Sequence, residues 1–293
     1  MHILGLAWTE DLEWGLHIVH KMWYFLGLFP ILFTIVRKEY ITKYISAFLL
    51  AISITEVFSY LVWFELIPPF KNATVINPTP FMSHISYNPI LAFATYIVLH
   101  EIFFNKKITN LIFALYSFFA ISMSINMFIT GGRAGQVVFF VMIAILIFQF
   151  FDRQRIKSLI IISILLPVIF FSAFQASEIF RERVTAAFQE AISFSEKNNN
   201  SVGLRINMAI NSWDIIKNNL IIGVGTGDFP REYSKANKMN SPELNDSTNP
   251  HNMYTLILIE LGLIGLMSML SIFYYQIKLS YNSSNKFIRD VGL

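Results

Sequence analysis

Apolar residues run through the chain in seven long segments that contain few charges. A helix needs about 20 predominantly apolar residues to cross the hydrocarbon core of a bilayer. The segments lie approximately at residues 14–36, 44–66, 86–104, 109–129, 134–151, 158–176 and 251–275. This pattern predicts an all-α protein, a polytopic transmembrane helix bundle of about seven spans.

Two of the predicted spans carry residues that are unusual in a membrane helix. The first contains His17, His20 and Lys21, and the sixth contains Pro167. Because proline removes a backbone hydrogen bond, we expect a kink in the sixth span. No N-terminal stretch has the pattern of a cleaved signal peptide, so we expect the first span to be retained.

Basic residues are unevenly distributed among the short loops. The loops that follow spans one, three, five and seven contain Arg37, Lys38, Lys43, Lys106, Lys107, Arg153, Arg155, Lys157, Lys278, Lys286 and Arg289. The short loops on the opposite side contain only Lys71 and Arg133. Lysine and arginine are enriched in cytoplasmic loops, so the distribution predicts an outer N-terminus and a cytoplasmic C-terminus.

One connection, residues 177–250, is long and lies on the predicted outer side. Within it, Phe180, Val184 and Phe188 recur at helical spacing, as do Ile206, Ala209, Ile210, Trp213, Ile216 and Leu220. We predict amphipathic helices at about 178–195 and 203–218, separated by a polar turn at Ser195–Ser201, which would lie on the membrane surface or cap the bundle. The predicted division is a six-span bundle at 1–176, a periplasmic loop at 177–250, and a final span with a cytoplasmic tail at 251–293.

Composition agrees with a membrane protein and excludes several other classes. Apolar residues make up 55% of the chain and charged residues 14%, whereas a soluble domain carries about 25% charged residues. There is no cysteine, which excludes disulfides, thiolate catalysis and cysteine metal sites. A net charge of +3 is too balanced to favour nucleic-acid binding.

Two carboxylates fall inside predicted spans. Glu56 lies near the middle of the second span, and Glu260 lies in the seventh. Ionisable groups in a bilayer are costly and often functional, for example in a transport path. Each could equally form a structural hydrogen bond between helices, and the sequence leaves both readings open.

Two glycine-containing motifs lie on the outer side. Arg133 follows Gly131 and Gly132 in a predicted hairpin, where it could bind phosphate through two parallel hydrogen bonds or anchor the hairpin at the interface. The second motif, Gly223-x-Gly225-x-Gly227, has neither a βαβ unit nor the lysine of a P-loop. It could be a backbone cradle or a simple turn.

The last span is preceded by Asn249-Pro250-His251-Asn252. Asn249 is a plausible N-cap and Pro250 fits the first helical position, so we predict that His251 lies in the first turn. The helix dipole would disfavour its charged form, as a general base requires, although His251 could also merely cap the helix. The sequence shows no metal-binding motif, and we predict no metal and no cofactor.

These motifs follow one another in a particular order. They are Gly132-Arg133-Ala134-Gly135; Arg205 at the start of a helix with Trp213; Gly223-x-Gly225-x-Gly227-x-Phe229; His251-Asn252-x-Tyr254; and Glu260-x-Gly262-x-x-Gly265-Leu266. The ordered set resembles the O-antigen ligase and polymerase superfamily of bacterial inner membranes, over roughly residues 80–275. Members of that superfamily typically have more spans than the seven predicted here, so this chain resembles a short variant or a fragment.

The resemblance implies a metal-independent glycan transferase that faces the periplasm. Its donor would be a glycan on undecaprenyl pyrophosphate, and its acceptor the lipid A-core for a ligase or another repeat unit for a polymerase. By similarity, Arg133 and Arg205 would hold the pyrophosphate and His251 would be the general base. The further substrate-binding residues would be Gly223, Gly225, Gly227, Asn252, Tyr254 and Glu260. The alternatives from other classes are a membrane transporter, which would use Glu56 and Glu260, and an inactive fragment.

Overall fold

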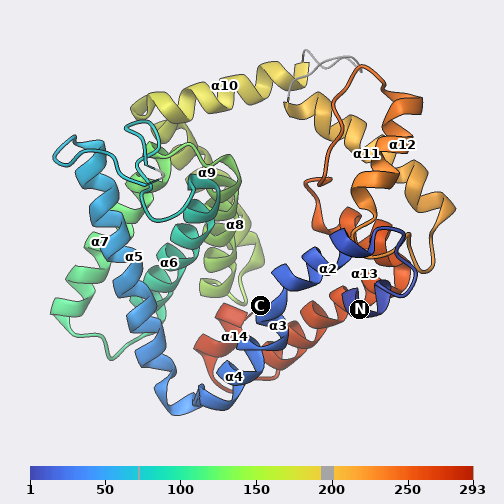
Figure 1. Cartoon of the computed structure of the whole chain (residues 1–293). Helices are drawn as coiled ribbons and strands as arrows, with labels where there is room; N and C mark the ends of the chain where they lie inside the picture. The colour runs from blue at the N-terminus through green and yellow to red at the C-terminus, as the bar shows by residue number, and fades with distance from the viewer. Residues whose placement is uncertain (72, 193–200, 293) are drawn as a thin grey trace. The chain divides into compact units, whose positions relative to one another are not determined.

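The computed structural model describes residues 1–71, 73–192 and 201–292, whose regular secondary structure is helical, with no β-strand among them (Figure 1). Six helices are long and apolar enough to cross a membrane, and a bent helix pair would make a seventh span. The all-α polytopic fold is therefore confirmed. The chain forms two compact units, unit 1 from Met1–Arg37 with Phe188–Leu293 and unit 2 from Lys38–Ala187.

Unit 2 contains five of the spans. They are α5 (Ile41–Trp63, preceded by the short helix η1 at Lys38–Tyr40), α6 (His84–Phe104), α7 (Asn110–Ile129), α8 (Arg133–Phe150) and α9 (Arg155–Ala176). Helix α6 is the most buried and packs against both α7 and α8. Only 6% of the apolar part of α9 is buried. The helix continues through Pro167.

The first predicted span differs from the single helix expected at 14–36. The structure has α2 (Leu12–Lys21), α3 (Trp23–Leu26) and α4 (Leu28–Ile35), with a bend of 57° between α2 and the rest. The first break falls at Met22, beside the polar end of α2 at His20 and Lys21, and the second at Gly27, which lacks a side chain to favour the helix. Unit 1 also contains a short N-terminal helix, α1 (His2–Gly5).

The two predicted amphipathic helices are present as α10 (Glu178–Ile192) and α11 (Ser201–Asn218). The predicted turn at Ser195–Ser201 lies outside the described residues except for its last position. A third helix, α12 (Phe229–Asn240), was not predicted. On α11 most of the predicted apolar positions are exposed, including Ile206, Ile210 and Trp213, whereas the predicted position Ile216 is buried with Met208 and Ile215 against α12 and the last span.

The last span, α13 (Met253–Tyr281), is longer than predicted and is interrupted at Gly262. There the backbone has φ 63° and ψ −163°, so two helical pieces meet at a break inside the membrane segment. A short helix, α14 (Lys286–Gly292), ends the described chain. Helix α13 packs against α1, α11 and α12, which are all elements of unit 1.

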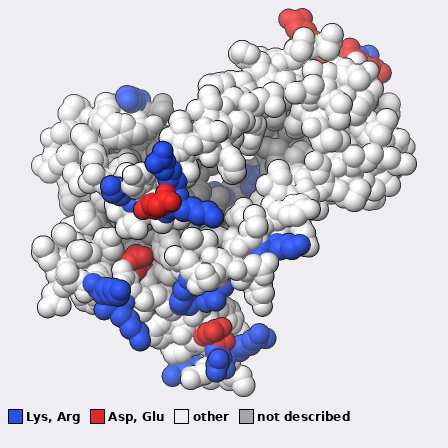
Figure 2. Space-filling model, turned by 90° about the horizontal axis from the view of Figure 1, so that it is seen from below, with Lys and Arg blue, Asp and Glu red and all other residues white. Residues whose placement is uncertain are grey.

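Charged side chains are sparse on much of the surface. Figure 2 views the molecule from below Figure 1 and shows clusters of lysine and arginine with few acidic side chains among them. Such clusters are typical of the cytoplasmic side of a membrane protein. The orientation of the spans remains a prediction.

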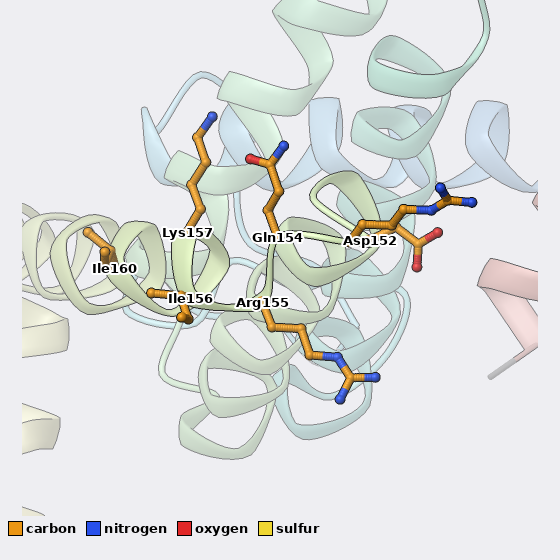
Figure 3. Close-up of a pocket in the computed structure, with 7 residues that line it drawn as sticks. Asp152, Gln154, Arg155, Ile156, Lys157 and Ile160 are labelled. Atoms are coloured by element: carbon orange, nitrogen blue, oxygen red, sulfur yellow. The ribbon is translucent and has the colours of Figure 1, made fainter.

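The turn between α8 and α9 borders a surface depression of about 810 Å³, lined by Asp152, Arg153, Gln154, Arg155, Ile156, Lys157 and Ile160. In Figure 3 the side chains of Gln154 and Lys157 point one way and that of Arg155 points the opposite way. Because these polar groups diverge, they do not form a binding site for one ligand. We interpret this turn as one of the basic loops that orient the protein.

Candidate functional site

Arg133 begins α8 directly after a tight turn at the end of α7. The N–H of Gly131 donates to Oδ1 of Asn77 at 3.0 Å, and the side chain of Asn88 donates to the carbonyl of Gly132 at 3.4 Å. A Cβ atom on Gly132 would lie 2.6 Å from Nδ2 of Asn88. The close approach of these side chains explains why both positions of the turn are glycine.

A chain of buried polar side chains lies behind this turn. Thr130 donates to Asn88 at 2.7 Å, and Tyr87 donates to Oδ1 of Asn126 at 3.0 Å. The side-chain amide of Asn126 in turn donates to Ser59 at 3.1 Å. Hydrogen bonds inside a membrane bundle hold helices in register, so this network ties the Arg133 turn to α5, α6 and α7.

Glu56 belongs to the same region of unit 2. It is 1% exposed and accepts a hydrogen bond of 2.6 Å from Ser122, which joins α5 to α7. Its second oxygen, Oε2, has no hydrogen-bond partner among the described residues. The structure thus supplies the interhelical hydrogen bond that was one of the two readings of Glu56.

Arg205 and His251 both belong to unit 1 and are both exposed. The position of His251 corrects the prediction, because α13 begins at Met253 and its N-cap is Asn252, whose side chain accepts from the N–H groups of Tyr254 and Thr255. His251 therefore precedes the helix instead of lying in its first turn, and the argument from the helix dipole no longer applies to it. It has φ 53°, and its own N–H donates to Oδ1 of Asn249 at 2.7 Å.

The predicted substrate-binding residues next to His251 are accessible. Asn252 is exposed, although its side-chain oxygen serves as the helix cap, and Tyr254 is 52% exposed in the first turn of α13. From Met253 onward, α13 borders an apolar groove of about 500 Å³, together with residues of α1, α2 and α3. Within unit 1, the polar and exposed start of α13 therefore lies next to an apolar groove.

The glycine-rich segment is packed against other backbone of unit 1. The N–H groups of Val224 and Gly225 donate to the carbonyls of Ile259 and Glu260 at 2.9 and 3.0 Å. These bonds place the segment beside the break in α13. Gly223, Gly225 and Gly227 all have positive φ, between 72° and 118°, a region that favours glycine.

The glycines also allow close approach. A Cβ atom on Gly225 would lie 2.6 Å from Cα of Thr9, and one on Gly227 would lie 2.7 Å from the backbone of Gly15. The sequence left open whether this segment is a backbone cradle for a ligand or a simple turn. In the structure it is a turn, in which close packing accounts for the glycines. Direct contact between these glycines and a substrate remains a prediction.

Asp228 is a buried residue of this region that the sequence analysis missed. It is 1% exposed and accepts three hydrogen bonds of 2.9 Å, from the hydroxyl of Thr9 and the N–H groups of Glu10 and Asp11. The partners lie more than 200 positions away, so no local pattern could reveal them. The sequence Gly227-Asp228-Phe229-Pro230 could have indicated the start of α12, because Pro is favoured in the first turn.

Glu260 is also enclosed by residues of its own unit. It is 3% exposed, the backbone N–H of Gly227 acts electrostatically on its carboxylate, and its Oε2 lies 3.8 Å from Nδ1 of His2. Burial and the N-terminal charge lower the pKa of His2, which favours its neutral form. The backbone carbonyl of Glu260 therefore holds the glycine-rich segment through Gly225, and the contact of its side chain with substrate remains a prediction.

The predicted catalytic residues are divided between the two units, with Arg133 in unit 2 and Arg205 and His251 in unit 1. Their convergence on one ligand remains a prediction. Among the described residues, no group of three or more histidine, aspartate or glutamate side chains could hold a metal ion. The absence of a metal from the reaction remains a prediction as well.

Six helices that could cross a membrane, with a bent pair that would make a seventh span, define this chain as a multi-pass membrane protein whose final span is broken at Gly262. The family model described as O-antigen ligase matches residues 118–270, more than half of the chain. The chain therefore belongs to the O-antigen ligase family. A search of curated proteins found no match.

Proposed function

We propose that this protein transfers an oligosaccharide or polysaccharide from undecaprenyl pyrophosphate to an acceptor hydroxyl, as an O-antigen ligase acting on the lipid A-core. It would work in the bacterial inner membrane, with the Arg133 turn and residues 177–250 facing the periplasm. The observation that carries the proposal is the family match over residues 118–270, which includes all three predicted catalytic residues.

The reaction is a displacement at the anomeric carbon of the donor sugar. The acceptor oxygen forms a bond to that carbon while the bond to the pyrophosphate oxygen breaks, and undecaprenyl pyrophosphate leaves with both electrons. His251 takes the proton of the acceptor hydroxyl, for which its exposure and its position before α13 are suitable. Attack opposite the leaving group inverts the anomeric carbon.

Two guanidinium groups supply the electrostatic part of the proposal. Pyrophosphate is already a good leaving group, provided that its developing charge is stabilised. Arg133 and Arg205 remain charged at physiological pH and can each bind phosphate oxygens through two hydrogen bonds. The proposal requires that both reach the same pyrophosphate.

A polymerase that joins repeat units would use the same donor and the same chemistry, and it differs only in the acceptor. Family membership supports both assignments equally, because the matched family does not separate them. The transporter alternative has less support. The matched family is described as O-antigen ligase, and the match does not include Glu56, one of the two carboxylates that a transport path would use.

Complementation tests the proposal. The chain and its His251→Ala and Arg205→Ala variants would be expressed at matched membrane levels in a bacterium that lacks its own O-antigen ligase, with His20→Ala as an exposed histidine control from α2. We expect a lipopolysaccharide ladder from the wild type and from His20→Ala, and none from the other two. A ladder that survives both substitutions would contradict the site assignment. No ladder from any version would contradict ligase activity and direct the test to repeat-unit polymerisation.

A further inference from the structure

We propose that Arg183 is a further substrate-binding residue, which contacts the donor pyrophosphate at the turn that carries Arg133. Arg183 belongs to α10, within the amphipathic helix predicted at 178–195, and is not among the predicted site residues. This inference rests on the proposed function, since it names an additional contact for the same donor. It adds a second cation from unit 2 to the site.

The placement of Arg183 follows from the way α10 is attached to unit 2. The hydroxyl of Ser177 donates to the carbonyl of Phe128 at 2.6 Å, and the rings of Phe128 and Phe180 pack edge to face with centroids 5.0 Å apart. Phe128 lies in the last turn of α7, directly before the Arg133 turn. Arg183 follows Phe180 by three residues, so it projects from a similar face of α10 toward that turn.

Arg183 lies directly beside the glycine of the turn. A Cβ atom on Gly131 would lie 3.3 Å from both Nε and Nη2 of Arg183. The backbone of Arg133 belongs to the same turn, because its N–H donates to the carbonyl of Gly131 at 3.1 Å. The absence of a side chain at Gly131 therefore lets the Arg183 guanidinium approach the segment that presents Arg133.

The charge of Arg183 is not neutralised within the described part of the chain, where no carboxylate forms an ion pair with it. Its neighbour on the same helix, Arg181, does pair with a carboxylate, Glu178, at 3.8 Å. Arg183 also acts electrostatically on the imidazole of His84 at the start of α6. A half-buried guanidinium with no carboxylate partner, beside the turn that carries Arg133, is suited to an anion with several oxygens, such as pyrophosphate.

Direct lipid binding tests this inference without measuring transfer. The purified full chain in nanodiscs would be titrated with radiolabelled undecaprenyl pyrophosphate, with undecaprenol as the uncharged control. The variants are Arg183→Ala, Arg183→Lys and the matched control Arg181→Ala. We expect Arg183→Ala to weaken undecaprenyl pyrophosphate binding about tenfold, Arg183→Lys to weaken it less, and Arg181→Ala to stay within about twofold. Undecaprenol binding should not change, which would exclude a general loss of structure.

The outcomes separate this inference from the proposed function. If the wild type binds undecaprenyl pyrophosphate and Arg183→Ala binds it as tightly, the role of Arg183 is refuted and the proposed donor stands. If the wild type does not distinguish undecaprenyl pyrophosphate from undecaprenol, both the inference and the proposed donor are wrong.

Discussion

The turn at Gly131 in unit 2 and the glycine-rich segment at 223–227 in unit 1 differ in what lies next to each glycine. Gly131 faces the ends of flexible polar side chains, Asn77 and Arg183. Gly223, by contrast, faces the backbone of Ile259 and Glu260 and has φ 72°. Glycine therefore allows side chains to approach the turn at Gly131, whereas at Gly223 it allows two backbone segments to pack closely. The turn at Gly131 gathers polar groups that can bind a ligand, whereas contact between the glycines at 223–227 and a substrate remains a prediction.

Among these glycines, we expect an added side chain to have its largest effect on stability at Gly262, the break in α13. At Gly262 a Cβ atom would overlap the carbonyl of Ile221, and φ is 63°. We expect Gly262→Ala to lower the free energy of unfolding by at least about 3 kcal/mol, since backbone cannot move aside as a side chain can. Thermal unfolding in detergent measures the loss. Gly27→Ala is the control, because its Cβ would have no neighbour closer than 3.5 Å and should change stability little.

The second prediction concerns Asp228, which holds the N-terminal segment on the glycine-rich segment. Asp228→Ala leaves the N–H groups of Glu10 and Asp11 without their acceptor. We expect a loss of about 2–4 kcal/mol and faster hydrogen exchange at those two amides. The Glu10–Arg231 ion pair, at 2.8 Å but about half exposed, is the comparison. Glu10→Gln should cost less than about 1 kcal/mol, and an equal loss from both variants would contradict the assignment.

A smaller effect on stability is expected at Gly131. Its added Cβ would meet only Oδ1 of Asn77 and the end of Arg183, both of which can shift. We expect Gly131→Ala to change the free energy of unfolding by less than about 1 kcal/mol, while it weakens undecaprenyl pyrophosphate binding severalfold by displacing Arg183. Parallel melting and lipid titration would check this. A stability loss as large as that of Gly262→Ala would remove the distinction between the two segments.

The smallest effect is a pH dependence in the loop that leads to His251. Hydrogen bonds from Ser234 and Asn237 hold the pKa of Asp246 below its usual range. A pKa that is lower in the folded state stabilises the fold above about pH 4, and this contribution is lost as the pH falls through the folded-state pKa. Asp246→Asn should therefore flatten the decline in melting temperature between pH 5 and pH 3. An unchanged decline would show that Asp246 does not contribute to it.

The sequence predicted the features that depend on local chemistry. The lengths of the apolar segments predicted six of the spans, because every helix that crosses a bilayer must be long enough to span its hydrocarbon core. The start of α13 was misplaced because Asn249 and Asn252 are both suitable caps, and only the folded backbone selects Asn252. The bend in the first span was not predicted either. The bend lies between α2 and α3. A hydropathy profile shows how apolar a segment is, but it does not show where the helix within that segment breaks.

For the candidate site, the sequence identified residues but not their contacts. Arg133, Arg205 and His251 could be named from motifs, whereas Asp228 and Arg183 could not. Asp228 is explained by bonds to residues 9–11, and Arg183 by the attachment of α10 to α7. These contacts join segments that are far apart in the sequence, so they become visible only in the folded chain.

The proposed function requires that the Arg133 turn and His251 act on one donor molecule. Because the chain contains no cysteine, a pair introduced at Ala134 and Met253, both exposed, can be probed with a short bifunctional maleimide. A pair at Glu10 and Arg231 within unit 1 is the positive control. We predict cross-linking of the Ala134–Met253 pair in membranes that contain undecaprenyl pyrophosphate. If each cysteine reacts singly and the control pair cross-links, but the Ala134–Met253 pair does not, the claim of a shared site is contradicted.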